Sequence, residues 1–336
     1  MSAEDKARVA NIFDVARLAG VSHQTVSRVV NDLPNVRPAT RQRVEDAIRQ
    51  LRYRPSTAAR SLVTRRSRTI GLITTGAPDY GPSSTLLGFN EAARTARYLV
   101  SISSMLEADA ASMRQAVDQL LSQNVEGIVL IAAHRGALEA IQGIDLGVPL
   151  LAVESSGRVG FHSVSIDQYR GAYDATTHLI ELGHESIVHV AGPEDSMDAT
   201  ERVRGWRAAL SDHGFVSREP LVGDWTPASG FAIGQQLAAS RSFTAVFSAN
   251  DQMALGLIHA FASAGIRVPQ DVSVVGFDDI PEAEHFAPPL TTIRQDFAEL
   301  GRTVMQTLLE LQLDEAALPE HPVPQPVVRE STAARS

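Results

Sequence analysis

Polar side chains stand at the ends of several apolar runs in the second half of the sequence. Runs typical of buried strands end in Glu154, Asn250, Asp278 and Gln295. In an open parallel sheet, ligands bind beyond the carboxyl ends of the strands. These carboxylates and amides are therefore candidate ligand contacts.

Arg202 and Trp225 belong to the same group of candidates. Arg202 follows the apolar run 186–192, and Trp225, one of only two tryptophans, lies in the polar segment "GDWTPASG". Carboxylates, amides and a guanidinium hold sugar hydroxyls well, while an indole covers the apolar face of a sugar ring. The set therefore predicts a sugar site.

Individual residues near these strand ends also have purely structural explanations. Asp279 and Asp296 can each cap a helix, and Arg202 can pair with Glu201 or Asp198. The prediction of a sugar site therefore depends on several polar residues reaching one sheet edge, and not on any one of them.

The elements that position these residues alternate along the chain from Thr69 onward. Short apolar runs alternate with stretches of helical spacing such as 112–124 and 251–265, the pattern of parallel sheets covered by helices on both faces. About 265 residues exceed one common sheet, so we expect an α/β core of two doubly wound parallel-sheet subdomains. Strands are expected within nine segments: 69–75, 98–104, 126–132, 148–154, 162–167, 186–192, 244–250, 272–279 and 290–296.

Three short helices are expected before this region. The apolar spacing predicts them over 12–19, from residue 23 onward, and over 38–51. Gly20 permits a tight turn after the first helix, and Ser22 can cap the second. Two short helices joined by such a turn form the helix-turn-helix arrangement, so the head is predicted to be a small all-α domain.

The second of these helices buries a stripe of three valines, Val26, Val29 and Val30, and turns its other side chains outward. Short donors and acceptors with one arginine, exposed at a helix start, are typical of a helix that reads another molecule. The outward residues are His23, Gln24, Thr25, Ser27 and Arg28.

Charge is distributed unevenly along the 336 residues. Residues 1–68 hold 14 Lys and Arg against 6 Asp and Glu, whereas the remainder holds 16 against 33. A basic head on an acidic body indicates that the head alone meets a polyanion. The absence of cysteine, of a secretory leader and of a long apolar run leads us to expect a cytoplasmic protein without membrane contact.

Enzyme motifs are absent or incomplete. Lys6 is the only lysine, and no phosphate-binding, dinucleotide-binding or nucleophile-elbow motif occurs. His184 and His189 in "HESIVH" are one residue too far apart for a zinc-protease motif. Glu154 and Asp278 have the residue types of a glycosidase pair, but a glycosidase needs no basic helix-turn-helix head. We therefore expect no enzymatic activity, metal or cofactor.

Long segments of the chain resemble the LacI/GalR family of transcriptional regulators. "IFDVARLAGVSHQTVSRVVND" and "VRPATRQRVEDAIRQLRYRPSTAARSL" resemble the DNA-binding head and hinge of that family. "LIELGHESIVHVAGP", "ANDQMALGLIHAFASAGIRVPQDVSVVGFDD" and "PPLTTIRQDF" resemble its sugar-sensing core, which has a periplasmic-binding-protein-like fold. The resemblance covers nearly the whole chain.

The resemblance implies a division of the chain into four parts. These are a helix-turn-helix domain over 1–55, a hinge helix or linker over 56–67, a core over 68–330 and a tail over 331–336. The segment 56–67, taken by itself, fits a short helix and a plain linker equally well. Within the core, an N-subdomain would comprise about 68–165 and 296–322, and a C-subdomain about 166–295 and 323–330.

The resemblance also implies roles in DNA binding. His23, Gln24 and Arg28 would face base edges in the major groove. In the hinge, Ala59 would enter the minor groove and Leu62 would wedge into a central base step. The residues implied to hold phosphates are Ser22, Thr25, Ser27, Asn31 and Tyr53.

In the core, the resemblance implies effector contacts at nearly the residues reached from the strand ends: Glu154, Arg202, Trp225, Asn250, Asp278, Gln295 and Phe297. The chain departs at four positions from the member that it follows in most motifs. It has Glu154 in place of Asp, Ile131 in place of a polar amide, His23 in place of Tyr and Asp79 in place of Leu. The identities of the sugar and of the operator bases therefore stay open.

The combined prediction is a repressor of a sugar-utilisation operon. A homodimer binds a pseudo-palindromic operator, and a small neutral sugar, such as a galactoside, releases it by binding between the subdomains. A neutral ligand is expected because two carboxylates face one guanidinium. The chain shows no heptad repeat after the core, so we expect dimers and not tetramers. A corepressor ligand, as in purine-sensing relatives, and a sugar-binding module without gene control stay open as alternatives.

Overall fold

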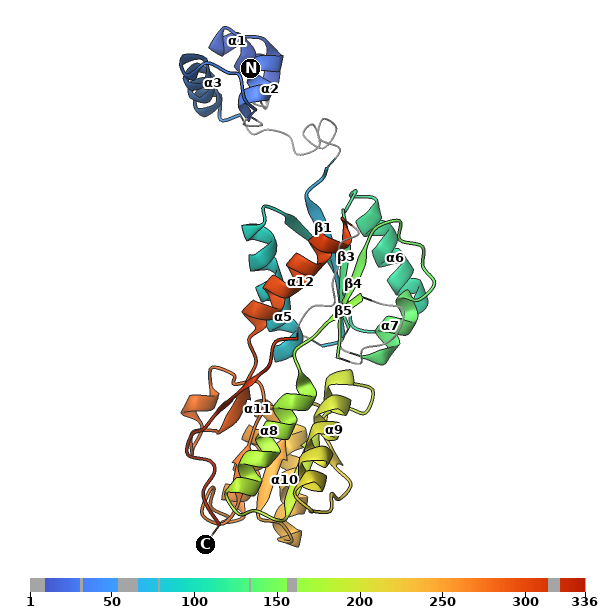
Figure 1. Cartoon of the computed structure of the whole chain (residues 1–336), viewed down its shortest axis with the longest axis vertical. Coiled ribbons are helices and arrows are strands. Elements are labelled where there is room, and N and C mark those ends of the chain that lie inside the picture. The colour runs from blue at the N-terminus through green and yellow to red at the C-terminus, as the bar shows by residue number, and fades with distance from the viewer. Residues whose placement is uncertain are drawn as a thin grey trace, which may run out of the picture. The chain divides into compact units, whose positions relative to one another are not determined.

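The computed structural model of the protein describes residues 10–30, 33–53, 66–77, 79–132, 134–155, 162–313 and 321–335. The chain forms two compact units, one ending at Arg68 and one beginning at Thr69. In its described residues the first unit is helical, and the second combines parallel sheets with helices (Figure 1). The predicted fold class, a helical head with a two-sheet α/β core, is therefore confirmed.

The head packs three helices around a small core. Asn11 caps the first helix by accepting the N–H groups of Phe13 and Asp14, and Gly20, with φ 63°, ends it in the left-handed conformation. The core consists of small and β-branched side chains, among them Val15 and Val44, which are fully buried. The helices are α1 (Ile12–Ala19), α2 (His23–Val30) and α3 (Pro38–Leu51), as the sequence predicts.

A five-stranded parallel sheet with the order β2-β1-β3-β4-β5 begins the second unit. Helices α5 and α12 cover one face of this sheet, and α6 and α7 cover the other (Figure 1). Alternate side chains pack against opposite layers, because Ile70 and Leu72 join the core with α5 and α12 whereas Ile73 and Leu130 join the core with α6 and α7. The strands are β1 (Thr69–Thr75), β2 (Leu99–Met105), β3 (Ile128–Ile131), β4 (Leu150–Val153) and β5 (His162–Val164). The helices are α5 (Tyr80–Thr95), α6 (Ala110–Leu121), α7 (Arg135–Ile141) and α12 (Phe297–Leu311).

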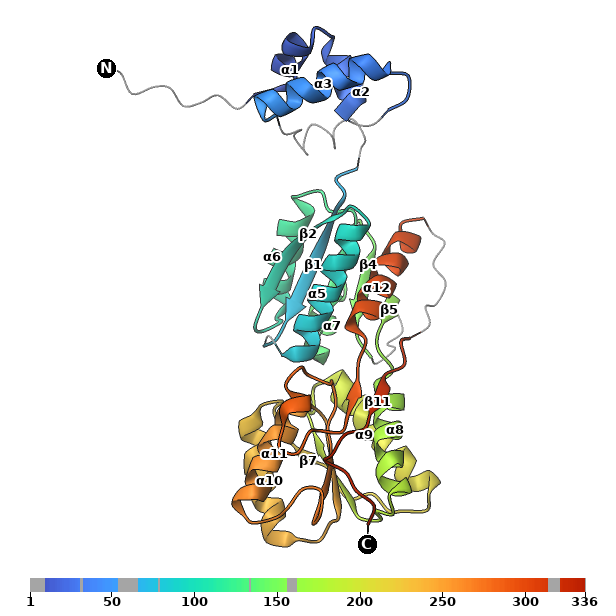
Figure 2. The same ribbon diagram turned by 90° about the vertical axis from the view of Figure 1, so that its left-hand side faces the viewer.

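A second parallel sheet has the order β7-β6-β8-β9. Helices α8 and α9 cover one face, and α10 and α11 cover the other (Figure 2). Trp206, Phe247 and Phe277 belong to the core on the first face, and Phe261 belongs to the core on the second. The strands are β6 (Ile187–Ala191), β7 (Leu221–Val222), β8 (Ala245–Ser248) and β9 (Ser273–Val275). The helices are α8 (Gln168–Glu181), α9 (Met197–Asp212), α10 (Pro227–Ser240), α11 (Asp251–Ser263) and the 3-10 helix Ala283–His285.

Glycines set how closely the helices approach in these layers. An added Cβ at Gly88 would collide with the backbone of Phe297, so α5 lies directly on the first turn of α12. Gly230 and Gly256 allow the same close approach between α10 and α11. Of the helices in the described ranges, none has the length and apolar character that a membrane crossing requires.

The chain passes three times between the two sheets. Helix α8 follows β5, α12 follows β10 (Thr292–Arg294), and β11 (Gln325–Val327) follows α12 and pairs antiparallel with β10. Each of the nine predicted strand segments contains a strand of the structure. The sequence does not predict β7, which is only two residues long, or β11, which contains Pro326; a proline fits there because β11 is an edge strand.

Residues 331–335 pack against the second sheet, although the sequence predicts a tail outside the core. Ser331 is fully buried, and its hydroxyl donates to the Val274 carbonyl over 2.6 Å and accepts the N–H of Thr291 over 2.8 Å. The N–H of Val274 donates to the Ser331 carbonyl over 2.8 Å. The end of the chain therefore extends the hydrogen bonding of β9.

Candidate functional site

Two adjoining hollows lie where the strand ends of both sheets meet, and we refer to them together as the cleft. The first hollow is lined by Tyr80 and His134 from the first half of the unit and by Arg202, Trp225, Asn250 and Asp278 from the second half. The second hollow is lined by residues that include Ile131, Glu154, Gln168, Gln295 and Phe297. All seven residues predicted as ligand contacts thus line the cleft, and their contact with a ligand stays a prediction.

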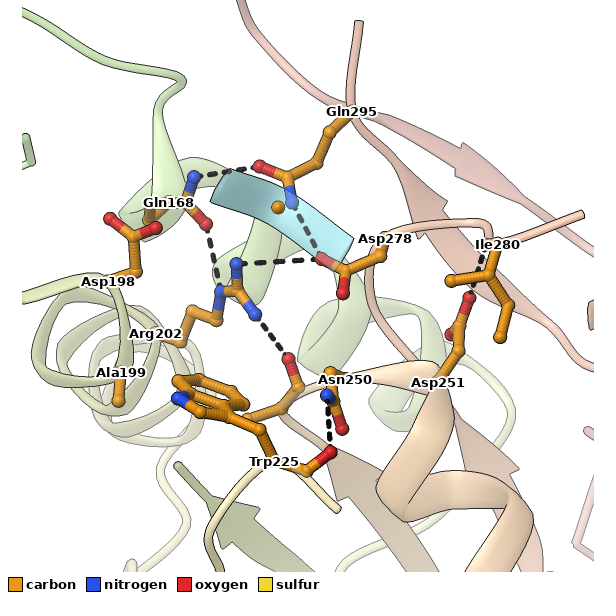
Figure 3. Close-up of polar contacts among 12 residues, drawn as sticks. Gln168, Asp198, Ala199, Arg202, Trp225, Asn250, Asp251, Asp278, Ile280 and Gln295 are labelled. Carbon is orange, nitrogen blue, oxygen red and sulfur yellow. Dashed lines mark hydrogen bonds and ion pairs between the residues drawn. The ribbon is translucent and has the colours of Figure 1, made fainter. Parts of the chain in front are cut away.

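Arg202 lies at the centre of a buried polar network (Figure 3). Its Nε donates to Oε1 of Gln168 over 2.8 Å, and its Nη1 donates to the carbonyl of Ala249. Its Nη2 lies 3.7 Å from Oδ1 of Asp278, and its guanidinium stands 4.0 Å from the centre of the Phe277 ring. These contacts fix the guanidinium in one orientation, with part of it facing the first hollow.

Asp278 is held by the same network. Gln295 donates to Oδ1 of Asp278 over 2.7 Å, and Gln168 donates in turn to Oε1 of Gln295 over 2.8 Å. Burial raises the pKa of Asp278 to about 6, although the Arg202 guanidinium acts in the opposite direction. A carboxyl group with this pKa is ionised at pH 7 and becomes largely protonated at pH 5.

Asn250 and Trp225 line the first hollow beside Arg202, whose guanidinium lies 5.5 Å from the centre of the Trp225 ring. Asn250 caps α11 by accepting the N–H of Met253, and its amide donates to the Trp225 carbonyl over 3.0 Å. The backbone is strained at two lining residues, since φ is 71° at Trp225 and 109° at Asp278. Such strain concentrates at ligand-binding sites, where the surrounding structure holds it in place.

The structural explanations for single residues have different outcomes. Asp296 does cap α12, accepting the N–H of Glu299 over 2.7 Å. The cap expected at Asp279 is wrong, because its carboxylate instead accepts from Arg294 and Arg329. The expected pairing of Arg202 with Glu201 or Asp198 in its own helix is also wrong. Glu201 binds Arg204, and Asp198 binds Ser155. Arg202 instead lies close to the carboxylate of Asp278.

Sequence reasoning did not select several polar lining residues, and two of them, Gln168 and Asp198, form hydrogen bonds described above. Gln168 starts α8 directly after the predicted strand segment 162–167, so the strand-end argument, applied once more, reaches it. Asp198 lies one helical turn before Arg202 on α9 and lines both hollows, but the sequence gives it only a structural alternative.

The two histidines of "HESIVH" do not converge. His184 binds the hydroxyls of Thr244 and Ser273, whereas His189 is fully buried and binds the Phe247 carbonyl through Nδ1. Burial lowers the pKa of His189 to about 3, so its ring is neutral. Within the described residues, no group of three His, Asp or Glu side chains is placed to hold a metal ion.

The head presents the first two turns of α2. Ser22 accepts the N–H of Thr25 over 3.2 Å, while Val26 and Val29 are buried in the head core. His23, Gln24 and Arg28 are exposed as predicted, but Thr25 and Ser27 are partly buried. Tyr53 packs half-buried against the head core. Three further predicted DNA contacts, Asn31, Ala59 and Leu62, lie outside the described residues.

Comparisons with known proteins point to one family. Residues 11–56 match the model of bacterial regulatory proteins of the lacI family, and residues 176–332 match a periplasmic binding protein-like domain. The lactose operon repressor of Escherichia coli (strain K12) is 35% identical over 324 residues, which are 96% of this chain and 90% of that repressor.

Two solved structures extend this similarity to the fold. The crystal structure of the lac repressor dimer bound to operator and the anti-inducer ONPF matches with a TM-score of 0.88 and 34% identity, over 97% of this chain and 100% of that one. The complex of the transcriptional regulator CelR with cellobiose matches with a TM-score of 0.70 and 32% identity, over 96% and 99% of the two chains.

Proposed function

Because this chain belongs to the lacI family of bacterial regulatory proteins, we propose that it represses a sugar-utilisation operon and releases its operator when a sugar binds in the cleft. It is a DNA-binding transcriptional regulator, as its relatives are. The proposed form is a homodimer in the cytoplasm. Its two-fold symmetry would place the two heads on the two halves of a pseudo-palindromic operator.

The observation that carries the sugar proposal is the buried network of Arg202, Asp278 and Gln295 at the wall of the cleft. Vicinal sugar hydroxyls can donate to the carboxylate and accept from the guanidinium, while Trp225 covers the apolar face of the ring. An anionic ligand would meet Asp278 and Glu154 against a single guanidinium, so the network favours a neutral sugar such as a galactoside. A sugar also lies in the related CelR complex, which contains cellobiose.

The head supports sequence-specific reading of DNA. Residues 1–68 carry eight more basic than acidic residues, and His23, Gln24 and Arg28 stand exposed on the first two turns of α2. In the major groove, the Gln24 amide suits adenine and the Arg28 guanidinium suits guanine. The proposed roles of Ala59 and Leu62 in a hinge that enters the minor groove complete this assignment.

Fluorescence anisotropy with the full-length protein tests the proposal. An operator is first selected from a random pool of duplexes, and its affinity is then measured with and without galactosides, cellobiose and related neutral sugars. Arg202→Ala is expected to abolish release by the sugar while leaving the affinity for operator without sugar unchanged. Arg204→Ala is the matched control, because Arg204 lies on the same helix but pairs with Glu201 at the surface.

Other outcomes of this experiment identify the alternatives. A ligand that tightens the operator complex would make the protein a corepressor-dependent regulator. A sugar that binds a protein with no selectable operator would leave only a sugar-binding module. Release of DNA from the Arg202→Ala variant at the wild-type sugar concentration would mean that the effector binds elsewhere.

A further inference from the structure

Two consecutive acidic residues follow β9, and only one of them reaches the cleft. Asp278 lines the first hollow, whereas Asp279 is absent from the lining of both hollows. Both residues have a positive φ, 109° at Asp278 and 55° at Asp279. A residue with a Cβ keeps such a backbone only where surrounding contacts hold it, because this region is sterically unfavourable. The turn that carries Asp278 therefore needs contacts that fix it.

Asp279 supplies such contacts through its side chain. Its carboxylate is 7% exposed and accepts hydrogen bonds from Nε of Arg294 over 2.6 Å and from Nη2 of Arg329 over 2.7 Å. Arg329 is fixed in turn, since its Nη1 donates to the Leu290 carbonyl over 2.8 Å and its N–H donates to the Thr291 hydroxyl over 2.9 Å. We refer to Asp279, Arg294 and Arg329 together as the Asp279 clamp. It ties the turn to β10 and to the segment that follows β11.

We propose that Asp279 is a positioning residue of the effector site: the Asp279 clamp holds the turn after β9 in the conformation that presents the Asp278 carboxylate to the sugar. This inference depends on the proposed function, because it gives Asp279 a role at the same site without contact to the ligand. Charge-assisted hydrogen bonds suit this role, since they are strong and restrict the carboxylate to one orientation.

Three consecutive residues at the end of β10 support the turn. The N–H of Asp278 donates to the Ile293 carbonyl over 2.8 Å. Arg294 comes next and binds Asp279. Gln295 follows and donates to Oδ1 of Asp278 over 2.7 Å. Because these contacts alternate between the two acids, a change in the backbone at Asp279 alters the distance between the Gln295 amide and the Asp278 carboxylate.

A different carboxylate holds the far side of the turn. The N–H of Ile280 donates to Oδ2 of Asp251, a fully buried residue of α11, over 2.9 Å (Figure 3). Oδ1 of Asp251 accepts the hydroxyl of Thr292 over 2.6 Å. Backbone hydrogen bonds thus fix the turn at Asp278 and at Ile280, and the side chain of Asp279 fixes the residue between them.

The two arginines of the Asp279 clamp differ in their exposure. The Arg329 side chain is 16% exposed, whereas that of Arg294 is 58% exposed. Water can replace the partner of an exposed guanidinium, so the pair with Arg294 contributes little. Breaking a largely buried pair leaves a charge without its partner. We therefore expect Arg329 to contribute more than Arg294 to the position of Asp278.

The test compares sugar binding and operator binding in full-length variants. Isothermal titration calorimetry gives the dissociation constants of methyl β-galactoside and cellobiose, and fluorescence anisotropy gives the operator affinity without sugar. We expect Asp279→Ala to weaken sugar binding about tenfold, because a hydrogen bond between the sugar and a charged group is largely lost. Arg329→Ala should have a similar effect, and Arg294→Ala an effect below about threefold. The operator affinity without sugar should keep its wild-type value in all three variants.

A double-mutant cycle shows whether Asp279 acts through Asp278. Asp278→Asn keeps one acceptor oxygen and removes the charge that the Asp279 clamp positions. In this background Asp279→Ala should weaken sugar binding less than about twofold, because the group that it positions is already altered. A merely structural role would lower the melting temperature and weaken sugar binding by the same factor in both backgrounds.

Two further variants control for charge and for folding. Asp271→Ala removes a carboxylate that pairs with Arg267 on the surface of the same half of the unit, and it should leave the sugar affinity unchanged. Asp279→Asn keeps the size of the side chain and one acceptor oxygen. It replaces the alanine variant if that one does not fold, with an expected loss of sugar affinity of about threefold.

Two results would overturn the inference while leaving the proposed function intact. One is wild-type sugar affinity in the Asp279 variant, and the other is an equal loss of affinity in the wild-type and Asp278→Asn backgrounds. If no sugar altered operator binding by the wild-type protein, the proposed function itself would be wrong, and the inference would fall with it.

Discussion

Sugar affinity is expected to fall as the pH drops below 6, because Asp278 then loses its charge. Burial raises the pKa of this group to about 6 in the free protein. The ionised fraction is therefore about nine-tenths at pH 7 and about one-tenth at pH 5. If the sugar donates a hydroxyl to the carboxylate, its dissociation constant should be about tenfold higher at pH 5, equivalent to about 1.4 kcal/mol.

Isothermal titration calorimetry at pH 8, 7, 6 and 5 measures this dependence. Asp278→Asn should bind the sugar more weakly at every pH and lack the tenfold change. His134→Gln is the necessary second variant, because His134 also lines the first hollow. Equal wild-type affinity at pH 5 and 7, or the same fall in Asp278→Asn, would refute the assignment of Asp278.

The raised pKa of Asp278 also makes the free energy of unfolding depend on pH. Its native pKa lies above the ordinary value of 3.8, so its contribution to stability is fully present below pH 3.8 and is lost as the pH rises through 6. The loss amounts to about 3 kcal/mol. Urea unfolding should therefore show that the stability of Asp278→Asn relative to the wild type increases by about that amount between pH 4 and pH 7.

Four further substitutions have defined outcomes. An added Cβ at Gly192 would collide with the indole of Trp225, so Gly192→Ala should weaken sugar binding about tenfold in calorimetry without changing operator affinity in anisotropy. His189 stays neutral in the native state, whereas the unfolded chain takes up a proton at this residue below about pH 6.5. The free energy of unfolding of the wild type should therefore fall by about 1.4 kcal/mol per pH unit as the pH drops from about 6.5 toward 3. His189→Asn should keep a donor to the Phe247 carbonyl and show a shallower pH dependence in urea unfolding. Arg28→Ala should weaken operator binding by about 1–3 kcal/mol and relax the preference at one base position of each half-site. Arg41 lies on α3 and is expected near a phosphate, so Arg41→Ala should weaken binding to all sequences alike and make the salt dependence shallower. Identical changes in specificity for the two variants would contradict the assignment of α2 as the reading helix.

The sequence predicts the cleft well because one rule of α/β proteins applies to most of its residues. Glu154 follows a strand of the first sheet, Asn250 and Asp278 follow strands of the second sheet, and Gln295 follows β10. The carboxyl ends of the parallel strands in both sheets meet at the cleft. The alternation of short apolar runs with helical segments predicts the strands that these residues follow. The position of each of these side chains follows from a local pattern, the end of a strand. It can therefore be predicted before any tertiary contact is known.

Residues whose role depends on distant partners were not predicted. The bond between Ser155 and Asp198 joins residues 43 positions apart, and no local pattern distinguishes it from the pairing within α9 that the sequence suggests. Asp279 resembles a helix cap in sequence but binds Arg329, fifty positions later, in the segment that follows β11. The sequence does not reveal strand β11 because it contains Pro326, which is tolerated only because of the edge position of the strand.

The position of the buried network explains how an effector in the cleft would alter the core as a whole. Gln168 and Gln295 lie on two of the segments that pass between the sheets, and their side chains bind each other directly. Arg202 and Asp278 bind the same two glutamines, so the groups assigned to the sugar are also those that tie the connecting segments together. Each glutamine amide has one acceptor oxygen and two N–H donors. A sugar that replaces one partner of such an amide therefore changes the hydrogen bonds that the same amide makes with its other partners. The proposed effector site and the connection between the sheets therefore share one polar network, so we expect occupancy of the cleft to change the spacing of the sheets directly.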